Sequence, residues 1–137
     1  MVAVASAAKV EPQSPNLPSH RDPYYAGKWQ KPKAERYVDT LSPGTGESLG
    51  KVADGSVADA EAAIAAAKAA FREWRRVLPL ERAKMLRAIA DVLRKNGDEL
   101  AMIDAADCGN PYAEMVRDAQ AGAAQLDFYA GLVTEMK

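Results

Sequence analysis

The sequence predicts a mixed α and β fold in which short strands come first and about four amphipathic helices follow. Residues 24–53 contain runs rich in aromatic and β-branched residues, separated by glycine and proline, and such runs are typical of strands. From Ser56 onward the apolar residues recur at spacings of three and four, which is the period of a helix with one buried face. No internal repeat of fixed length is present.

Composition narrows the functional classes. A chain of 137 residues suits one domain that buries roughly two thirds of its unfolded surface. Its formal net charge is −1, so we expect neither a nucleic-acid partner nor a membrane partner. The single cysteine cannot form an internal disulfide, and the single histidine, His20, leaves too few ligands for a zinc site. No signal peptide or membrane span is recognisable, and these features together predict a soluble cytoplasmic protein.

Residues 1–23 are predicted to form a mobile tail, because alanine, serine and proline predominate there. Residues 24–137 are predicted to be the folded part, with strands in about 24–53 and helices in about 57–137. Three strand-like runs, YYAGKW, ERYVDTL and ESLGKVA, occur in the first region. The second and third predict a hairpin, since the segment SPGTG between them, Ser42 to Gly46, has the proline and glycines of a turn.

The glycines of this turn also approach the dinucleotide-binding pattern G-x-G-x-x-G, in the segment GTGESLG. Leu49 occupies the position of the third glycine, and a strand rather than a helix is predicted to follow. A pyrophosphate needs a helix N-terminus at this point. The turn interpretation is therefore favoured over a nucleotide site.

The first predicted helix follows Ser56, which forms an S-x-x-D capping signal with Asp59. Its predicted buried face is Val57, Ala60, Ile64, Ala67, Phe71 and Trp74. A second helix is predicted to begin at Pro79 and to end at Asn96-Gly97. Its predicted buried face is Ala83, Leu86, Ile89, Ala90 and Leu93.

The third predicted helix is short, capped by Asp98 and ended by Gly109. A fourth is predicted to begin at Asn110 and Pro111, with a buried face formed by Tyr112, Met115, Val116, Ala119, Ala123, Leu126, Tyr129 and Val133. Four aromatic side chains at helical spacing are predicted to be core rather than a ligand platform: Phe71, Trp74, Phe128 and Tyr129.

Cys108 is the natural candidate for a nucleophile, but its position argues against that role. It falls at a helix C-terminus, where the helix dipole disfavours a thiolate, and Asp107 adds a negative charge beside it. The only histidine lies in the predicted tail, so no base is at hand. Nearby carboxylates are irregularly spaced: Asp104, Asp107, Glu114 and Asp118. The residues therefore predict no self-contained active site.

The order of several motifs resembles the amino-terminal part of aldehyde dehydrogenases. After GKW comes TLSPGTGESLGKV, similar to the family pattern T-x-N-P-x-T-G-E…G-x-V, and then ADAEAAIAAAKAAFREW, similar to D-x-x-x-A-x-x-A-A-x-x-A-F-x-x-W. ERAKMLRAIADVL, ELAMIDAADCGNP (similar to E-L-A…D-T-G-K-P) and YAGL follow in the family order, from about Tyr24 to the chain end. Ser42 replaces the usual asparagine, and Cys108 occupies a threonine position of a helix-ending turn.

The resemblance implies an incomplete α/β fold, in which these helices would cover a parallel sheet formed by later segments. A complete relative would oxidise an aldehyde to a carboxylic acid through a cysteine thiolate, with NAD or NADP accepting hydride. The family's catalytic and cofactor-binding residues belong to later segments. We therefore expect residues 1–137 alone to bind no NAD(P) and to be inactive, with an aldehyde substrate only in the complete protein.

One family site is expected to survive in part. Some relatives hold a structural monovalent cation with oxygens that match Thr40, Leu41 and Asp107 of this chain, and such oxygen ligands suit a hard cation. The alternative is that Asp107 caps a helix or bridges to the hairpin without an ion.

The sequence also allows a function of a different class, that of a stand-alone helical interaction module. Helices whose apolar faces lack the later sheet must leave those faces exposed or bury them elsewhere. The chain alone is therefore expected to self-associate or to form a homo-oligomer. A stand-alone helical interaction module would use the same faces to bind a partner.

Overall fold

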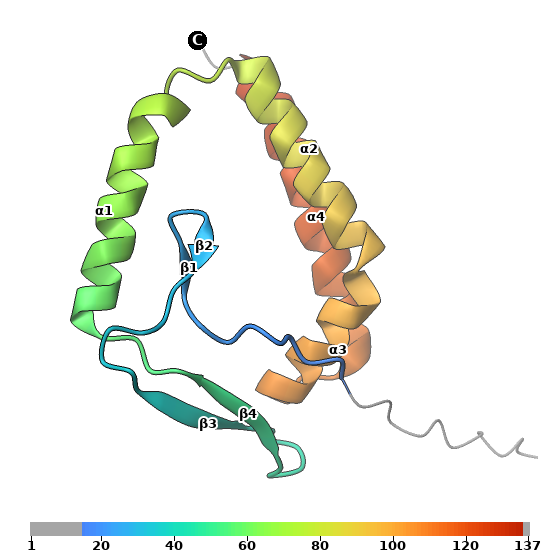
Figure 1. The fold of residues 1–137 in the computed structure, drawn as a ribbon. Helices are drawn as coiled ribbons and strands as arrows, with labels where there is room; N and C mark the ends of the chain where they lie inside the picture. The colour runs from blue at the N-terminus through green and yellow to red at the C-terminus, as the bar shows by residue number, and fades with distance from the viewer. Residues whose placement is uncertain (1–14, 136–137) are drawn as a thin grey trace, which may run out of the picture.

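The computed structural model describes residues 15–135. The elements are β1 (Tyr24–Tyr25), β2 (Lys28–Trp29), β3 (Tyr37–Leu41), β4 (Ser48–Ala53), α1 (Val57–Trp74), α2 (Pro79–Lys95), α3 (Gly97–Cys108) and α4 (Tyr112–Glu135). The predicted order of a short β region followed by four helices is confirmed. Figure 1 shows α2 and α4 packed along each other, with α1 standing apart from this pair.

The run YYAGKW does not form the single strand that its composition suggested. It folds back on itself, so that β1 pairs with β2 antiparallel and Tyr24 lies opposite Trp29. The turn residues Ala26 and Gly27 have φ values of 53° and 76°. Glycine adopts positive φ readily, but alanine rarely does. Only one of the two turn residues therefore matched the pairs that usually indicate a two-residue hairpin turn.

The predicted hairpin is confirmed as β3 and β4, which pair antiparallel from Tyr37↔Ala53 to Leu41↔Ser48. Its turn is closed by the amide of Gly46, which donates to the carbonyl of Ser42 over 2.7 Å. Thr40 lies opposite Gly50 and Leu41 opposite Ser48, so β4 contains one extra residue, Leu49. This β-bulge lies next to the turn of the hairpin, at the end nearest α3 (Figure 1).

The predicted cap of the first helix is confirmed in both directions. The Ser56 hydroxyl accepts from the amide of Asp59 at 3.3 Å, and the Asp59 carboxylate accepts from the amide of Ser56 at 2.9 Å. The carboxylate also accepts from the Ser56 hydroxyl and, at 2.9 Å, from the amide of Lys33. Asp59 therefore joins the segment before β3 to the start of α1, and these donors hold the pKa of its carboxyl below the ordinary value.

Pro79 begins α2 as predicted. Near this start, the guanidinium of Arg82 donates to the carbonyls of Trp74 and Arg75, at 3.2 and 2.9 Å. It also lies over the Trp74 ring, 5.5 Å from the centroid. One side chain therefore caps the end of α1 and fixes it to the start of α2.

The predicted start of the third helix was wrong by two residues. Asn96 rather than Asp98 occupies the N-cap position, and its side-chain amide donates to the carbonyl of Val92 instead of capping α3. Asp98 lies in the first turn of α3, where a negative charge is also favourable. Gly109 ends this helix with φ 77°, as its position predicted.

The core of the described residues is made almost entirely of small side chains. α2 and α4 meet at alanines with no exposed surface: Ala83, Ala90, Ala123 and Ala130. α3 adds Ala101, and Met115 of α4 is the largest apolar side chain in this core. Alanine lets two helix backbones approach closely, so the pair is compact while its total apolar burial is modest.

The prediction that the helix aromatics are core was wrong for these residues. The exposed fractions are 59% for Phe71, 43% for Trp74, 63% for Phe128 and 56% for Tyr129. On α1 the whole predicted buried face is exposed, including Val57 at 77% and Ile64 at 59%. Periodicity identifies which residues share a face, but it does not establish that something covers that face.

Most of the predicted mobile tail, residues 1–14, lies outside the described residues. Residues 15–23 run between the hairpin and α3 (Figure 1). The side-chain amide of Asn16 donates to Glu99 at 2.8 Å, and the carbonyl of Arg21 accepts from the amide of Ala53 at 3.1 Å. None of the helices within residues 15–135 is long and apolar enough to cross a membrane.

The buried alanines between α2 and α4, here called the alanine seam, predict that a larger side chain will destabilise the fold. Ala90→Leu adds three carbons at a fully buried position, so we expect the free energy of unfolding to fall by about 1–3 kcal/mol. Ala88→Leu, at an exposed position of the same helix, should change it by less than about 0.5 kcal/mol. Urea unfolding, monitored by circular dichroism, measures the free energy of unfolding of both variants. Equal losses in the two variants would contradict close packing at Ala90.

A second prediction concerns acid. Because the folded pKa of Asp59 is lowered, its stabilising contribution is complete above the ordinary value of 3.8 and is lost as pH falls through the folded pKa. We expect Asp59→Asn to be less stable at neutral pH and to lose less stability on acidification to pH 3. Glu61→Gln, an exposed carboxylate on α1, is the matched control. Identical acid profiles for the two variants would contradict the role of Asp59.

Candidate functional site

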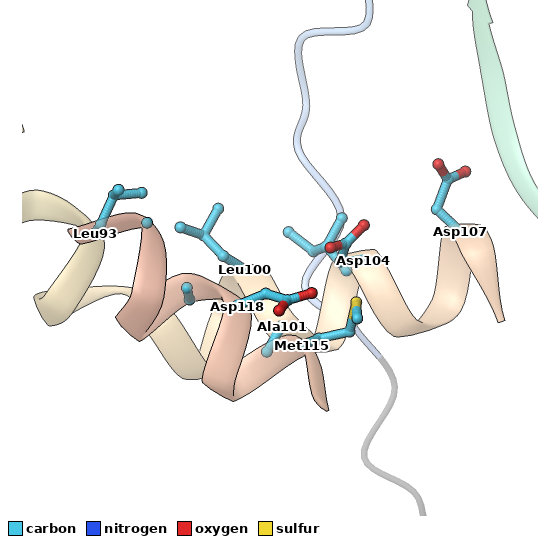
Figure 2. A pocket seen from close by; sticks show the side chains of 10 residues that line it. Leu93, Leu100, Ala101, Asp104, Asp107, Met115 and Asp118 are labelled. Carbon is cyan, nitrogen blue, oxygen red and sulfur yellow. The ribbon is translucent and has the colours of Figure 1, made fainter. Parts of the chain in front are cut away.

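Three cavities adjoin α3. The first, of about 420 Å³, lies among α2, α3 and α4 and has three carboxylates, Asp104, Asp107 and Asp118, above an apolar lining (Figure 2). The second, of about 540 Å³, lies between residues 16–19 and the helices α2 and α3. The third, of about 370 Å³, lies between the hairpin turn and the outer side of α3.

The carboxylates that seemed scattered in the sequence are partly brought together. Asp104, Asp107 and Asp118 line one cavity, whereas Glu114 pairs with Arg117. Within residues 15–135, however, no three His, Cys, Asp or Glu residues lie close enough together to hold a metal ion. The cavity therefore offers negative charge without the ligand group of a transition-metal site.

Cys108 is exposed and its thiol donates to the carbonyl of Asp104, one helical turn earlier, at 2.8 Å. His20 stacks on Trp29 of β2, with ring centroids 5.1 Å apart. Among residues 15–135 no basic side chain forms a hydrogen bond or an ion pair with the thiol. The thiol is therefore engaged as a donor to its own helix and lacks the base that would activate a nucleophile.

The three oxygen ligands predicted from the sequence come from two segments that lie against each other. A Cβ on Gly109 would be only 2.9 Å from Cγ of Pro43, so the end of α3 touches the hairpin turn. Ser42, which follows Leu41, and Ala106, which precedes Asp107, line the same cavity. No hydrogen bond within residues 15–135 joins Asp107 to Thr40 or Leu41.

Asp107 itself is uncommitted. It is exposed, and no hydrogen bond or ion pair within the described part of the chain engages its carboxylate. Figure 2 shows the carboxylate at the end of α3, directed away from Asp118. The carboxylate of Asp107, the hydroxyl of Thr40 and the carbonyl of Leu41 are oxygen donors of the type that hard cations prefer.

Sequence reasoning missed one residue of this region, Arg21, because it lies in the stretch predicted to be a mobile tail. Its guanidinium donates from Nη1 to the carbonyl of Leu49, the extra residue of the bulge, at 3.0 Å. From Nε it donates to the carbonyl of Pro18 at 2.6 Å. A single arginine in a segment without helical or strand periodicity gives no signal, so only the fold reveals this contact.

The sequence model of the aldehyde dehydrogenase family matches residues 29–137. The chain belongs to the aldehyde dehydrogenase family. It is 41% identical over 121 residues to the aldehyde dehydrogenase tropH of Talaromyces stipitatus, a match that covers 88% of this chain and 24% of that protein.

Solved structures agree with this assignment. An apo structure of an indole-3-acetaldehyde dehydrogenase is 28% identical with a TM-score of 0.84, over 89% of this chain and 29% of that one. A betaine aldehyde dehydrogenase of Staphylococcus aureus in complex with NAD⁺ is 29% identical with a TM-score of 0.81, over 85% of this chain and 24% of that one. The chain thus spans about a quarter of the length of these relatives.

Proposed function

We propose that this chain is the amino-terminal part of an NAD(P)-dependent aldehyde dehydrogenase that oxidises an aldehyde to a carboxylic acid. In this proposal the chain supplies the hairpin and the outer helices, and it has neither a catalytic nor a cofactor-binding residue. The family match over residues 29–137 and the NAD⁺ bound to a similar enzyme support the class of reaction. We further propose a cytoplasmic location and assembly into an oligomer, for which the single cysteine and the exposed apolar faces are the support.

The observation that carries the proposal is the uncovered face of α1. Val57, Ile64 and Phe71 follow one another along one side of the helix and are 77%, 59% and 59% exposed. Complete burial of such a side chain is worth about 1.5–3 kcal/mol, so covering this face would stabilise the complete protein. The rest of the enzyme is the partner that this face fits.

A chimera tests the proposal. Residues 29–137 replace the matching segment of the Talaromyces relative, and NAD(P)-dependent oxidation of an aldehyde is measured by absorbance at the nicotinamide band. We expect an active chimera and no activity for residues 1–137 alone. Phe71→Glu in the chimera should abolish assembly and activity by placing a charge on the covered face, whereas Ala69→Glu, at an exposed position on the opposite side of α1, should preserve both.

Two outcomes would contradict the proposal. One is a chimera that folds, judged by circular dichroism and native mass, yet tolerates Phe71→Glu without loss. The other is aldehyde oxidation by the chain alone that Cys108→Ser removes, since that result would assign catalysis to a thiol that we consider structural.

A stand-alone interaction module is the second candidate, and the same exposed face of α1 favours it. The module reading requires a monodisperse chain that melts cooperatively and captures a partner. The enzyme-segment reading instead expects helical signal without fixed tertiary packing, together with dye binding and self-association. Calorimetry combined with size-exclusion chromatography distinguishes the two.

We propose in addition that Thr40, Leu41 and Asp107 hold a structural monovalent cation. The support is the contact of Pro43 with Gly109, which brings the two segments together, and the uncommitted carboxylate of Asp107. The cation would join the hairpin to the end of α3 by charge, where the protein itself provides no hydrogen bond between these residues.

The cation site predicts a salt-specific effect. At constant ionic strength, replacing choline chloride by sodium chloride should slow amide exchange in residues 40–47 and broaden the ²³Na resonance. Asp107→Asn should remove both effects, and Asp118→Asn, another carboxylate of the cavity that Asp107 lines, should keep them. Equal responses of the two variants would contradict the site.

A further inference from the structure

α1 is held to the rest of the described chain at its ends rather than along its length. Asp59, in the first turn, is the only buried residue among the 18 of this helix. α2 and α4 pack along each other, whereas α1 stands apart from them (Figure 1). Because no apolar seam aligns α1 with another helix, its direction depends on the contacts at its two ends.

The start of α1 is anchored by a carboxylate. Asp59 accepts from the amides of Ser56 and Lys33, both at 2.9 Å. The first bond closes the N-terminal turn of the helix, and the second reaches the segment before β3. This end of α1 is therefore fixed to the β region.

The end of α1 is anchored by Arg82, which belongs to α2. The backbone hydrogen bonds of the connection, residues 75–78, span no more than four residues and so leave the angle between the helices open. Nη2 of Arg82 donates to the carbonyls of Trp74 and Arg75, at 3.2 and 2.9 Å, and the guanidinium lies over the Trp74 ring. The last carbonyls of a helix carry partial negative charge, so a cation is favourable there.

The side chain of Arg82 keeps this place although one of its donors is unsatisfied. Its Nε is buried and has no hydrogen-bond partner among residues 15–135. A buried donor without an acceptor destabilises a fold. The two carbonyl bonds and the contact with Trp74 therefore have to outweigh this penalty, and they hold the guanidinium at the corner between α1 and α2.

We propose that Arg82 is a positioning residue for the apolar face of α1 formed by Val57, Ile64 and Phe71. By closing the corner between α1 and α2, Arg82 sets the angle at which this face meets its partner. That partner is the later part of the same enzyme, so the inference rests on the proposed function. Without Arg82, α1 would pivot about its anchor at Asp59 and dock less tightly.

The test uses the chimera with the Talaromyces relative and measures amide exchange by mass spectrometry. Arg82→Met keeps an apolar stem beside Trp74 but has no donor for the two carbonyls. We expect exchange to become about tenfold faster along the whole of α1, residues 57–74, the factor that loss of a charge-assisted hydrogen bond gives. Loss of a helix cap alone would speed exchange only in the last turn, so the extent of the change separates positioning from capping.

Arg87→Met is the matched control, because Arg87 occupies an exposed position of the same helix as Arg82. It should leave the exchange of α1 unchanged. Arg82→Lys should restore part of the protection. Its ammonium group still donates to the helix end, but it lacks the planar guanidinium that lies over the Trp74 ring.

Failure of this inference and failure of the proposed function give different results. Exchange in α1 that is as fast in the chimera as in residues 1–137 alone would show an uncovered face, and it would overturn the proposed function and this inference together. Slower exchange in the chimera that Arg82→Met leaves unchanged, or alters only in residues 71–77, would overturn the positioning role alone. If the Met variant does not fold, the Lys variant decides by the same two criteria.

Discussion

The close contact of α2 and α4 through alanine side chains is the constraint on which the described fold depends. Four alanines without exposed surface bring the two helix backbones together, and α3 packs on α4 beside them. The hairpin then reaches this frame at its turn, where Pro43 touches Gly109. Because methyl groups bury little apolar area, this packing of α2, α3 and α4 fixes the distance between the helices but contributes little to the free energy of unfolding.

Local signals in the sequence accounted for most element boundaries, because their causes lie within a few residues. Ser56 and Asp59 satisfy each other at the start of α1, Pro79 begins α2, and Gly109 ends α3 in a conformation that suits glycine. Asn96 shows the limit of such reasoning. Its side chain turned to the preceding helix, and a local rule cannot choose between two helix ends that compete for one amide.

Burial was less predictable than secondary structure, and the candidate site was less predictable still. The period placed Ala83, Ala90 and Ala123 correctly in the core, but Phe71, Ile89 and Tyr129 of the predicted buried faces are exposed, because burial depends on which element covers a face. Asp107, Thr40 and Leu41 were named only through family resemblance. The role of Arg21 was not foreseen, since it depends on a bulge that brings together residues 28 positions apart.

The exposed face of α1 also has a consequence during protein synthesis. In a protein that resembles the relatives in length, this quarter of the chain leaves the ribosome first. At about 5–20 residues per second, the remaining three quarters take on the order of tens of seconds to follow. Throughout that interval Val57, Ile64 and Phe71 are uncovered while the alanine frame can already form. An apolar helix face that stays exposed during synthesis is prone to association with other chains, which is the hazard that chaperones counter.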